Sequence, residues 1–123
     1  MTPPDDLTKR ALIVADQSVE LFDLTDFLNK AGWEVIESAH DATTAGQMLR
    51  TAEPPYRLVI IAVPHSDPDT ISILRQALAS GSRVIAIDGA RMTQRDDLVL
   101  TVLRPYADDD LETALQTLGL VDT

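Results

Sequence analysis

The sequence is short of three residue classes: it has no cysteine, few aromatic residues, and half as many basic as acidic residues. The absence of cysteine excludes disulfide bonds and thiolate chemistry. The 10 Lys and Arg residues against 20 Asp and Glu residues give a formal net charge of −10. Such a charge repels phosphodiester backbones and anionic lipid surfaces. We therefore expect neither nucleic acid nor a membrane as a partner.

Long apolar stretches are also missing. The longest apolar run, Leu58–Pro64, is too short to cross a bilayer. The chain begins Met-Thr-Pro-Pro-Asp-Asp, without the basic residues and apolar stretch of a secretory signal. These features predict a soluble, cytoplasmic protein.

Enough apolar sequence is present for one hydrophobic core. With 123 residues and 45% hydrophobic content, the chain is long enough for one ordinary domain and too short for two. We expect a single domain over residues 1–123, with an ordered core from about 9 to 119 and an N-terminal extension at 1–8.

Short β-branched runs alternate with longer segments of helical periodicity, which is typical of βα units around a parallel sheet. Several of the runs are apolar at consecutive positions, as strands covered on both faces should be. The five predicted strands are Ala11–Ala15, Trp33–Ala39, Leu58–Val63, Val84–Ile87 and Val99–Leu103.

Residues that favour helix starts and ends lie between these strands. The predicted helices begin near Ser18, Asp41, Asp67-Pro68 and Asp108. Gly32 and Gly81 stand where the first and third helices need a left-handed residue to end. The apolar residues expected to face the core from these two helices are Phe22, Leu24, Phe27, Leu28, Ile71, Leu74, Ala77 and Leu78.

One crossover is irregular. The segment Gly89–Leu98 offers only ten residues between the fourth and fifth strands, whereas a parallel crossover normally needs about a dozen or more. We therefore expect the helix between these two strands to be shortened or missing.

In an open parallel sheet, ligands bind outside the carboxyl ends of the strands, near the point where the strand order reverses. The residues that follow the first, third, fourth and fifth strands are therefore the candidates for chemistry. They are Asp16, Gln17, residues 62–65, Asp88, Gly89, Arg104 and Pro105.

Four segments at these strand ends carry a family resemblance. They are Leu-Ile-Val-Ala-Asp at 12–16, Leu-Val-Ile-Ile-Ala-Val-Pro at 58–64, Val-Ile-Ala-Ile-Asp-Gly at 84–89 and Arg-Pro-Tyr at 104–106. Over nearly the whole chain, this arrangement resembles the CheY-like receiver domain of two-component response regulators. The resemblance implies a flavodoxin-like three-layer α/β/α sandwich with a five-stranded parallel sheet in the order 2-1-3-4-5, and a cis Arg104-Pro105 bond.

The same comparison reveals departures from the family. Its members have two acids after the first strand, a phosphoacceptor Asp ending the third, a Ser or Thr ending the fourth, and Lys-Pro ending the fifth. Asp16 and Pro105 agree with this pattern. The residues at the other four positions are Ala15, Ala62, Asp88 and Arg104. The resemblance therefore implies a degenerate receiver, in which Ala62 occupies the phosphoacceptor position.

Phosphoryl transfer to a carboxylate needs that carboxylate and a magnesium ion. With Ala15 and Ala62 at two acidic positions of the family, we expect no catalytic residue, no cofactor and no useful magnesium affinity. We expect Arg104 instead to form an ion pair with Asp88, Asp16 or both. Asp88 is then either a salt-bridge partner or a built-in negative charge that imitates phosphorylation.

These considerations favour a phosphorylation-independent protein-interaction module of bacterial signalling, with a kinase, regulator or output protein as its partner. The candidate contacts are Leu98, Leu100 and Tyr106, on the surface that the family uses for recognition and dimerisation. A homodimer through this surface is expected. Two alternatives stay open: a small-molecule sensor that uses the pocket at the strand ends, and a receiver phosphorylated at a non-standard acid.

Overall fold

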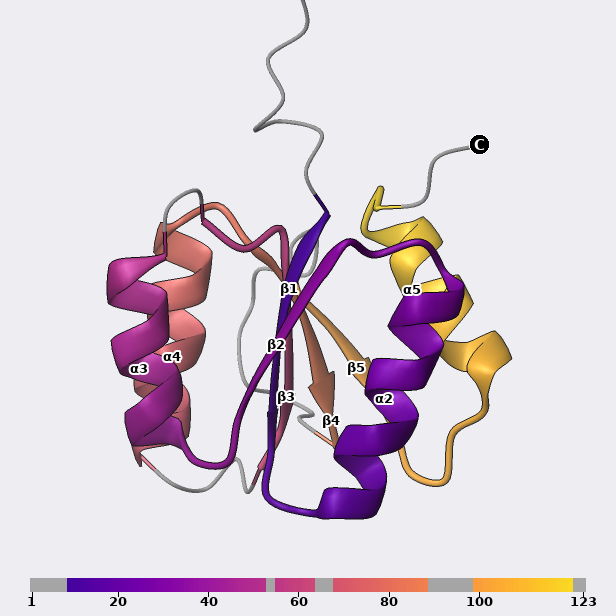
Figure 1. Cartoon of the computed structure of the whole chain (residues 1–123), viewed down its shortest axis with the longest axis horizontal. Helices are drawn as coiled ribbons and strands as arrows, with labels where there is room; N and C mark the ends of the chain where they lie inside the picture. Colours follow the sequence, from indigo (N-terminus) through magenta and orange to yellow (C-terminus); the bar gives the residue numbers. More distant parts are fainter. Residues whose placement is uncertain (1–8, 53–54, 64–67, 89–98, 121–123) are drawn as a thin grey trace, which may run out of the picture.

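Strands and helices alternate along the chain in the order that the sequence predicts (Figure 1). The computed structural model describes residues 9–52, 55–63, 68–88 and 99–120. The elements are β1 (Arg10–Ala15), α2 (Ser18–Lys30), β2 (Val35–Ala39), α3 (Ala42–Thr51), β3 (Leu58–Ala62), α4 (Pro68–Ala79), β4 (Arg83–Ile87), β5 (Val99–Val102) and α5 (Asp108–Thr117). The predicted shortening of the crossover between β4 and β5 falls on residues outside the described ranges.

The five strands form one parallel sheet in the order β2-β1-β3-β4-β5, which confirms the predicted fold. The largest difference in strand bounds is at β2, which begins at Val35 rather than at Trp33. The backbone N–H of Trp33 instead donates to the carbonyl of Leu28, at 3.0 Å. Trp33 therefore belongs to the turn that ends α2, and its buried side chain covers the core there.

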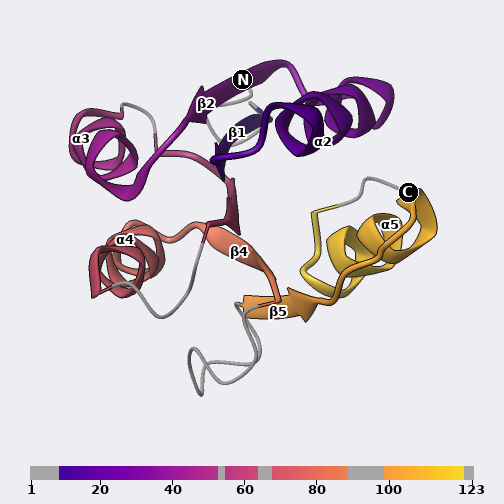
Figure 2. The ribbon, with the colours of Figure 1, turned by 90° about the horizontal axis from the view of Figure 1, so that it is seen from below.

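The sheet lies between two helical layers, with α2 and α5 on one face and α3 and α4 on the other (Figure 2). Alternate residues of β1 enter the two cores: Ile13 and Ala15 face α2 and α5, whereas Leu12 and Val14 face α3 and α4. From Ala11 to Ala15, the residues on both faces of this interior strand are buried. This double burial explains why its apolar residues are consecutive rather than alternating with polar ones.

Three of the predicted helix ends have the expected geometry. Asp41 caps α3 by accepting a hydrogen bond from the backbone N–H of Thr44, at 2.7 Å. Gly32 and Gly81 adopt left-handed backbone angles, with φ of 91° and 89°. Helix α2 begins at Ser18, as predicted, but Ser18 is its first helical residue and does not cap it, and Gln17 before it makes no side-chain cap.

Two apolar residues assigned to the core are exposed. Phe22 is 71% exposed, because the buried face of α2 is formed by Leu24, Phe27 and Leu28, and a residue two positions before Leu24 lies roughly 200° around the helix from it. Ile71 on α4 is 37% exposed, because it lies at the border of the buried face formed by Thr70, Ile73, Leu74 and Ala77. Within the described ranges, no helix is long and apolar enough to span a membrane.

Candidate functional site

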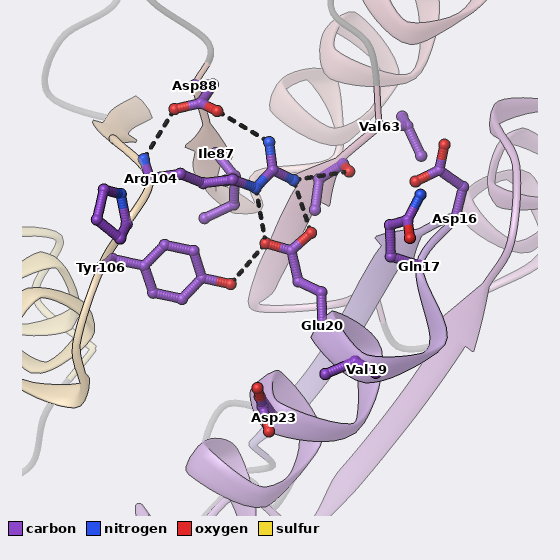
Figure 3. Close-up of a pocket in the computed structure, with 12 residues that line it drawn as sticks. Asp16, Gln17, Val19, Glu20, Asp23, Val63, Ile87, Asp88, Arg104 and Tyr106 are labelled. Atoms are coloured by element: carbon purple, nitrogen blue, oxygen red, sulfur yellow. Dashed lines mark hydrogen bonds and ion pairs between the residues drawn. The ribbon is translucent and has the colours of Figure 1, made fainter.

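The residues that follow four of the strands meet at the carboxyl ends of these strands, around a pocket of about 900 Å³ (Figure 3). The pocket is lined by Asp16, Gln17, Val19, Glu20, Asp23, Ala62, Val63, Ile87, Asp88, Arg104, Pro105 and Tyr106. The strand-end residues predicted from the sequence and described in the structure therefore come together around this pocket. The exception is Ala15, which is fully buried and does not line it. His65 and Gly89 lie outside the described residues.

Arg104 lies at the centre of the polar contacts in this pocket. Its guanidinium group binds the Glu20 carboxylate through two hydrogen bonds, from Nη2 to Oε1 at 2.6 Å and from Nε to Oε2 at 3.1 Å. The Nη1 atom donates to Oδ2 of Asp88 at 2.8 Å. The Nη2 atom also approaches the Ala62 carbonyl, at 3.4 Å. One side chain thus connects α2 with the ends of β3 and β4.

Asp88 holds this arrangement through both its backbone and its side chain. Its φ is 59°, a left-handed angle that Asp tolerates better than most residues. The Asp88 N–H donates to the Val102 carbonyl at 2.8 Å, and its Oδ1 accepts from the Arg104 N–H at 2.9 Å. The predicted pair between Arg104 and Asp88 is therefore present, and of the two interpretations of Asp88 the geometry corresponds to the salt-bridge partner.

Glu20 is the residue of this site that the sequence analysis missed. Its side chain is 12% exposed, and it accepts hydrogen bonds from Arg104 and from the Tyr106 hydroxyl, the latter at 2.7 Å. A signal was available, because Glu20 precedes Leu24 by four residues and Phe27 by seven. This spacing puts an acid on the buried face of α2. A buried acid on an apolar helix face requires a partner.

Burial and hydrogen bonding shift the pKa values of Glu20, Arg104 and Tyr106. Burial opposes ionisation of Glu20, but hydrogen bonds from Arg104 and Tyr106 outweigh it, so the pKa of Glu20 lies below its ordinary value. The hydrogen bond to Glu20 is the main cause that raises the pKa of Arg104. Burial, followed by the bond to Glu20, raises the pKa of Tyr106. Near neutral pH the pocket therefore holds an ionised Glu20, a cationic Arg104 and a neutral Tyr106.

Asp16 stands apart from this network. In Figure 3 it lies beside Gln17 and Val63, across the pocket from Asp88. Among the described residues no ion pair joins it to Arg104, so the alternative in which Arg104 bridges to Asp16 is wrong. The side chain of Asp16 is exposed to solvent.

The end of β3 has no carboxylate. Ala62 is the last residue of β3 and lies opposite Ala15 of β1 in the parallel register. Both methyl groups are buried in the core that faces α2 and α5. These two neighbouring strands therefore end in methyl groups rather than in carboxylates.

The donor set does not suit magnesium, the metal that the receiver fold implies. Magnesium prefers octahedral oxygen coordination with one or more carboxylates. Asp16 offers one such group, whereas both carboxylate oxygens of Asp88 accept hydrogen bonds from Arg104. Across the described ranges, no three His, Cys, Asp or Glu side chains gather as metal ligands would.

The three candidate interaction residues lie in different surroundings. Leu98 is outside the described residues. Leu100, on β5, is half-buried and packs against the core that faces α2 and α5. Tyr106 follows the cis Arg104-Pro105 bond, and its hydroxyl points to Glu20 rather than to solvent (Figure 3).

Comparisons with known proteins agree on the fold. No protein-family model and no curated protein matches the sequence. The chain is similar to a response regulator receiver protein from Sinorhizobium medicae, with a TM-score of 0.72 and 21% identity, covering 89% of this chain and 94% of that chain. It is similar to a CheY-like receiver domain from Methanospirillum hungatei, with a TM-score of 0.70 and 22% identity, covering 90% and 94%.

A further match is a pilus assembly-related protein from Burkholderia pseudomallei, with a TM-score of 0.66 and 13% identity, covering 100% of this chain and 97% of that chain. At such identities the likeness concerns the fold alone. This chain therefore has the receiver-domain fold found in two-component signalling proteins.

Proposed function

We propose that this chain is a non-catalytic protein-interaction module of the two-component type, and that it works without phosphorylation. The observation that carries the proposal is the pairing of Arg104 with Glu20 and Asp88 in front of Ala62. The Arg104 cation and the two acids paired with it lie beside Ala62, where a phosphoryl group and its metal would have to bind. The strand ends are thus held by fixed charges instead of by a transient modification.

The direct test is incubation with acetyl phosphate and Mg²⁺, followed by intact-mass measurement. We expect the wild-type mass to stay unchanged while a phosphorylatable receiver domain, treated in parallel, gains a phosphoryl group. A stoichiometric phosphoryl adduct would overturn the proposal, and peptide mapping would then identify the non-standard acid. Calorimetric titration with Mg²⁺ adds a second criterion, because saturable binding in the low-millimolar range or tighter would contradict the proposal as well.

For the mode of association, we propose a homodimer through β5. This strand is the last in the sheet order, so its outer edge is not paired with another described strand, and Leu103 beyond it is 63% exposed. Free strand edges pair readily with a second chain. Light scattering over a concentration series should show a dimer that a Leu103→Lys substitution weakens. A monomer at every concentration would remove this part of the proposal.

A second candidate function is supported by the pocket itself. Even with Arg104 paired, a volume of about 900 Å³ stays open beside the apolar side chains of Ala62, Val63 and Ile87. Pockets of this size with apolar walls and a few polar groups suit small molecules. A titration with indole as an apolar probe, followed by NMR, should shift the Ala62 and Val63 amides if the pocket binds ligands. Shifts spread over the whole surface would argue against a sensor.

A further inference from the structure

Helices α2 and α5 end in matching turns, at the end of the sheet away from the pocket at the strand ends (Figure 1). Each helix is followed by a left-handed glycine, Gly32 or Gly119, and the N–H of the next residue donates to a carbonyl of the last turn. These hydrogen bonds run from Trp33 to Leu28 at 3.0 Å and from Leu120 to Leu115 at 2.9 Å. The two turns thereby fold Trp33 and Leu120 back onto the same core, where both are buried.

A small cavity lies between these two helix ends, and we call it the helix-end cavity. Its volume is about 200 Å³, and its apolar walls come from Ala31 and Trp33 of one turn and from Leu115 and Leu120 of the other. An apolar cavity of roughly 150 Å³ is large enough to hold a benzene ring. The helix-end cavity therefore has room for one branched or aromatic side chain.

Two side chains of opposite charge also line the helix-end cavity, Lys9 from the residue before β1 and Glu112 from α5. The Lys9 ammonium group lies at the end of α2, because a Cβ atom on Gly32 would stand 3.9 Å from its nitrogen. The carbonyl groups of the last helical turn stabilise a cation there. Glu112 precedes Leu115 by three residues, which puts it on the same side of α5. The cavity thus combines apolar walls with a cation and an anion from two different elements.

We propose that the helix-end cavity binds a free α-amino acid with an apolar side chain. The side chain of the ligand packs against Trp33 and Leu120, its carboxylate pairs with Lys9 and its ammonium group pairs with Glu112. A ligand with a single charge would use only one of these two charged groups. The inference goes beyond the proposed function, because this cavity shares no lining residue with the pocket at the strand ends and lies apart from β5.

Tryptophan fluorescence of the full chain tests the site directly, because Trp33 is the single tryptophan of the sequence. With L-leucine as the probe, we expect a saturable change in emission with a Kd of about 1 mM or lower. Isoamylamine lacks the carboxylate of leucine, and isocaproate lacks its ammonium group. Each should bind about fivefold more weakly than leucine, since each loses one partly exposed charge pair. In NMR spectra, leucine should shift the amides of Trp33 and Leu120 and leave that of Ala62 unchanged.

Two charge variants assign the contacts. Lys9→Met should raise the Kd of leucine about fivefold without weakening the binding of isoamylamine. Glu112→Gln should raise the Kd of leucine by a similar factor without weakening the binding of isocaproate. Asp109→Asn removes an exposed acid from the start of the same helix, so this matched control should bind leucine as the wild type does. Thermal melts should show that all three variants stay folded, because none of these side chains is buried.

Three results would overturn the inference. The first is a Trp33 emission that does not change at leucine concentrations up to about 10 mM. The second is an equal Kd for leucine, isoamylamine and isocaproate, which would refute the role of the two charges. The third is a set of amide shifts around Ala62 with Trp33 unchanged, which would place the ligand in the pocket at the strand ends. None of these outcomes depends on phosphoryl transfer, so failure here is distinguishable from failure of the proposed function.

Discussion

The molecule uses the same three side-chain types, an arginine, a glutamate and a tyrosine, in two regions with different consequences. At the strand ends, Glu20 binds Arg104 and Tyr106, and Arg104 also binds Asp88. At the first residue of β1, Arg10 contacts Glu37 at 3.3 Å, and its guanidinium carbon lies 5.0 Å from the ring centroid of Tyr56. The Tyr56 hydroxyl in turn donates to Glu37.

The difference lies in what each group connects. Arg10 and Glu37 belong to β1 and β2, which are already joined by a ladder of backbone hydrogen bonds. Arg104 and Glu20 connect the segment after β5 with α2, and no backbone ladder joins these two elements. The Arg10–Glu37 pair therefore adds to strands that backbone hydrogen bonds already join. The Arg104–Glu20 pair instead joins two elements that no such ladder connects. We expect substitutions at the strand ends to loosen α2, and equivalent substitutions at Arg10 and Glu37 to affect stability alone.

The largest effect is expected for Arg104→Ala. Hydrogen bonds to charged groups contribute about 1.5–3 kcal/mol, and Arg104 is 43% exposed, so we expect a loss of about 2 kcal/mol in the free energy of unfolding. Urea denaturation measures this loss. The Glu20→Ala, Arg104→Ala double variant should be less destabilised than the sum of the single variants, because the buried Glu20 carboxylate is no longer left without its cation, and the Asp88 carboxylate that remains is more exposed to solvent. Wild-type stability in Arg104→Ala would show that the network does not hold the strand ends.

Glu20→Gln should come next, at about 1.5 kcal/mol near neutral pH. The pKa of Glu20 is lowered in the folded state, so the stabilisation from its charge is present above the unfolded pKa and disappears as pH falls through the folded value. The stability difference between wild type and Glu20→Gln should therefore shrink as pH falls below about 4.3. Chemical denaturation at a series of pH values tests this dependence, and a difference that stays constant with pH would contradict it.

Tyr106 and Tyr56 allow a matched comparison, with a smaller expected loss of stability. Tyr106→Phe and Tyr56→Phe each remove one hydroxyl that donates to a glutamate, so each should cost about 1 kcal/mol. Hydrogen exchange should separate them, because Tyr106→Phe is expected to speed exchange in the first turn of α2 and Tyr56→Phe is not. Equal changes at α2 in both variants would remove the distinction between the two regions.

Glu37→Gln should have the smallest effect, about 0.5 kcal/mol. Its pair with Arg10 is partly exposed, and β1 and β2 keep their backbone ladder without it. Thermal melts should show a small shift, and the amide resonances around the pocket should be unaffected. A loss as large as that of Glu20→Gln would mean that the two regions are equivalent.

The fold was largely predictable because its determinants are local. The buried apolar runs of β1 and β3, and left-handed glycines such as Gly32, can be recognised from short stretches of sequence. The Arg104–Asp88 pair was also predictable, since Asp88 directly follows β4 and Arg104 comes two residues after β5, the strand that lies parallel beside β4. Phe22 was assigned to the wrong side because four apolar residues within seven positions of α2 leave its buried face ambiguous.

The contacts of Glu20 could not be predicted from the sequence. Its partners lie 84 and 86 residues away in the sequence, so the contact depends on how α2 is placed against the end of β5. The spacing of Glu20 from Leu24 and Phe27 could have indicated that the acid is buried, but not which cation it meets. Long-range side-chain pairs need the packed structure, even when each element has been assigned correctly.

The most direct test of whether fixed charges hold the strand ends is the NMR signal of the Arg104 Nε–H group, which donates to Glu20. In the wild type we expect one slowly exchanging resonance whose position is unchanged by acetyl phosphate, beryllofluoride or Mg²⁺. The same resonance should exchange rapidly in Glu20→Gln. A shift of this resonance, or its replacement by a second one, when a phosphodonor or phosphoryl analogue is added to the wild type would contradict the account.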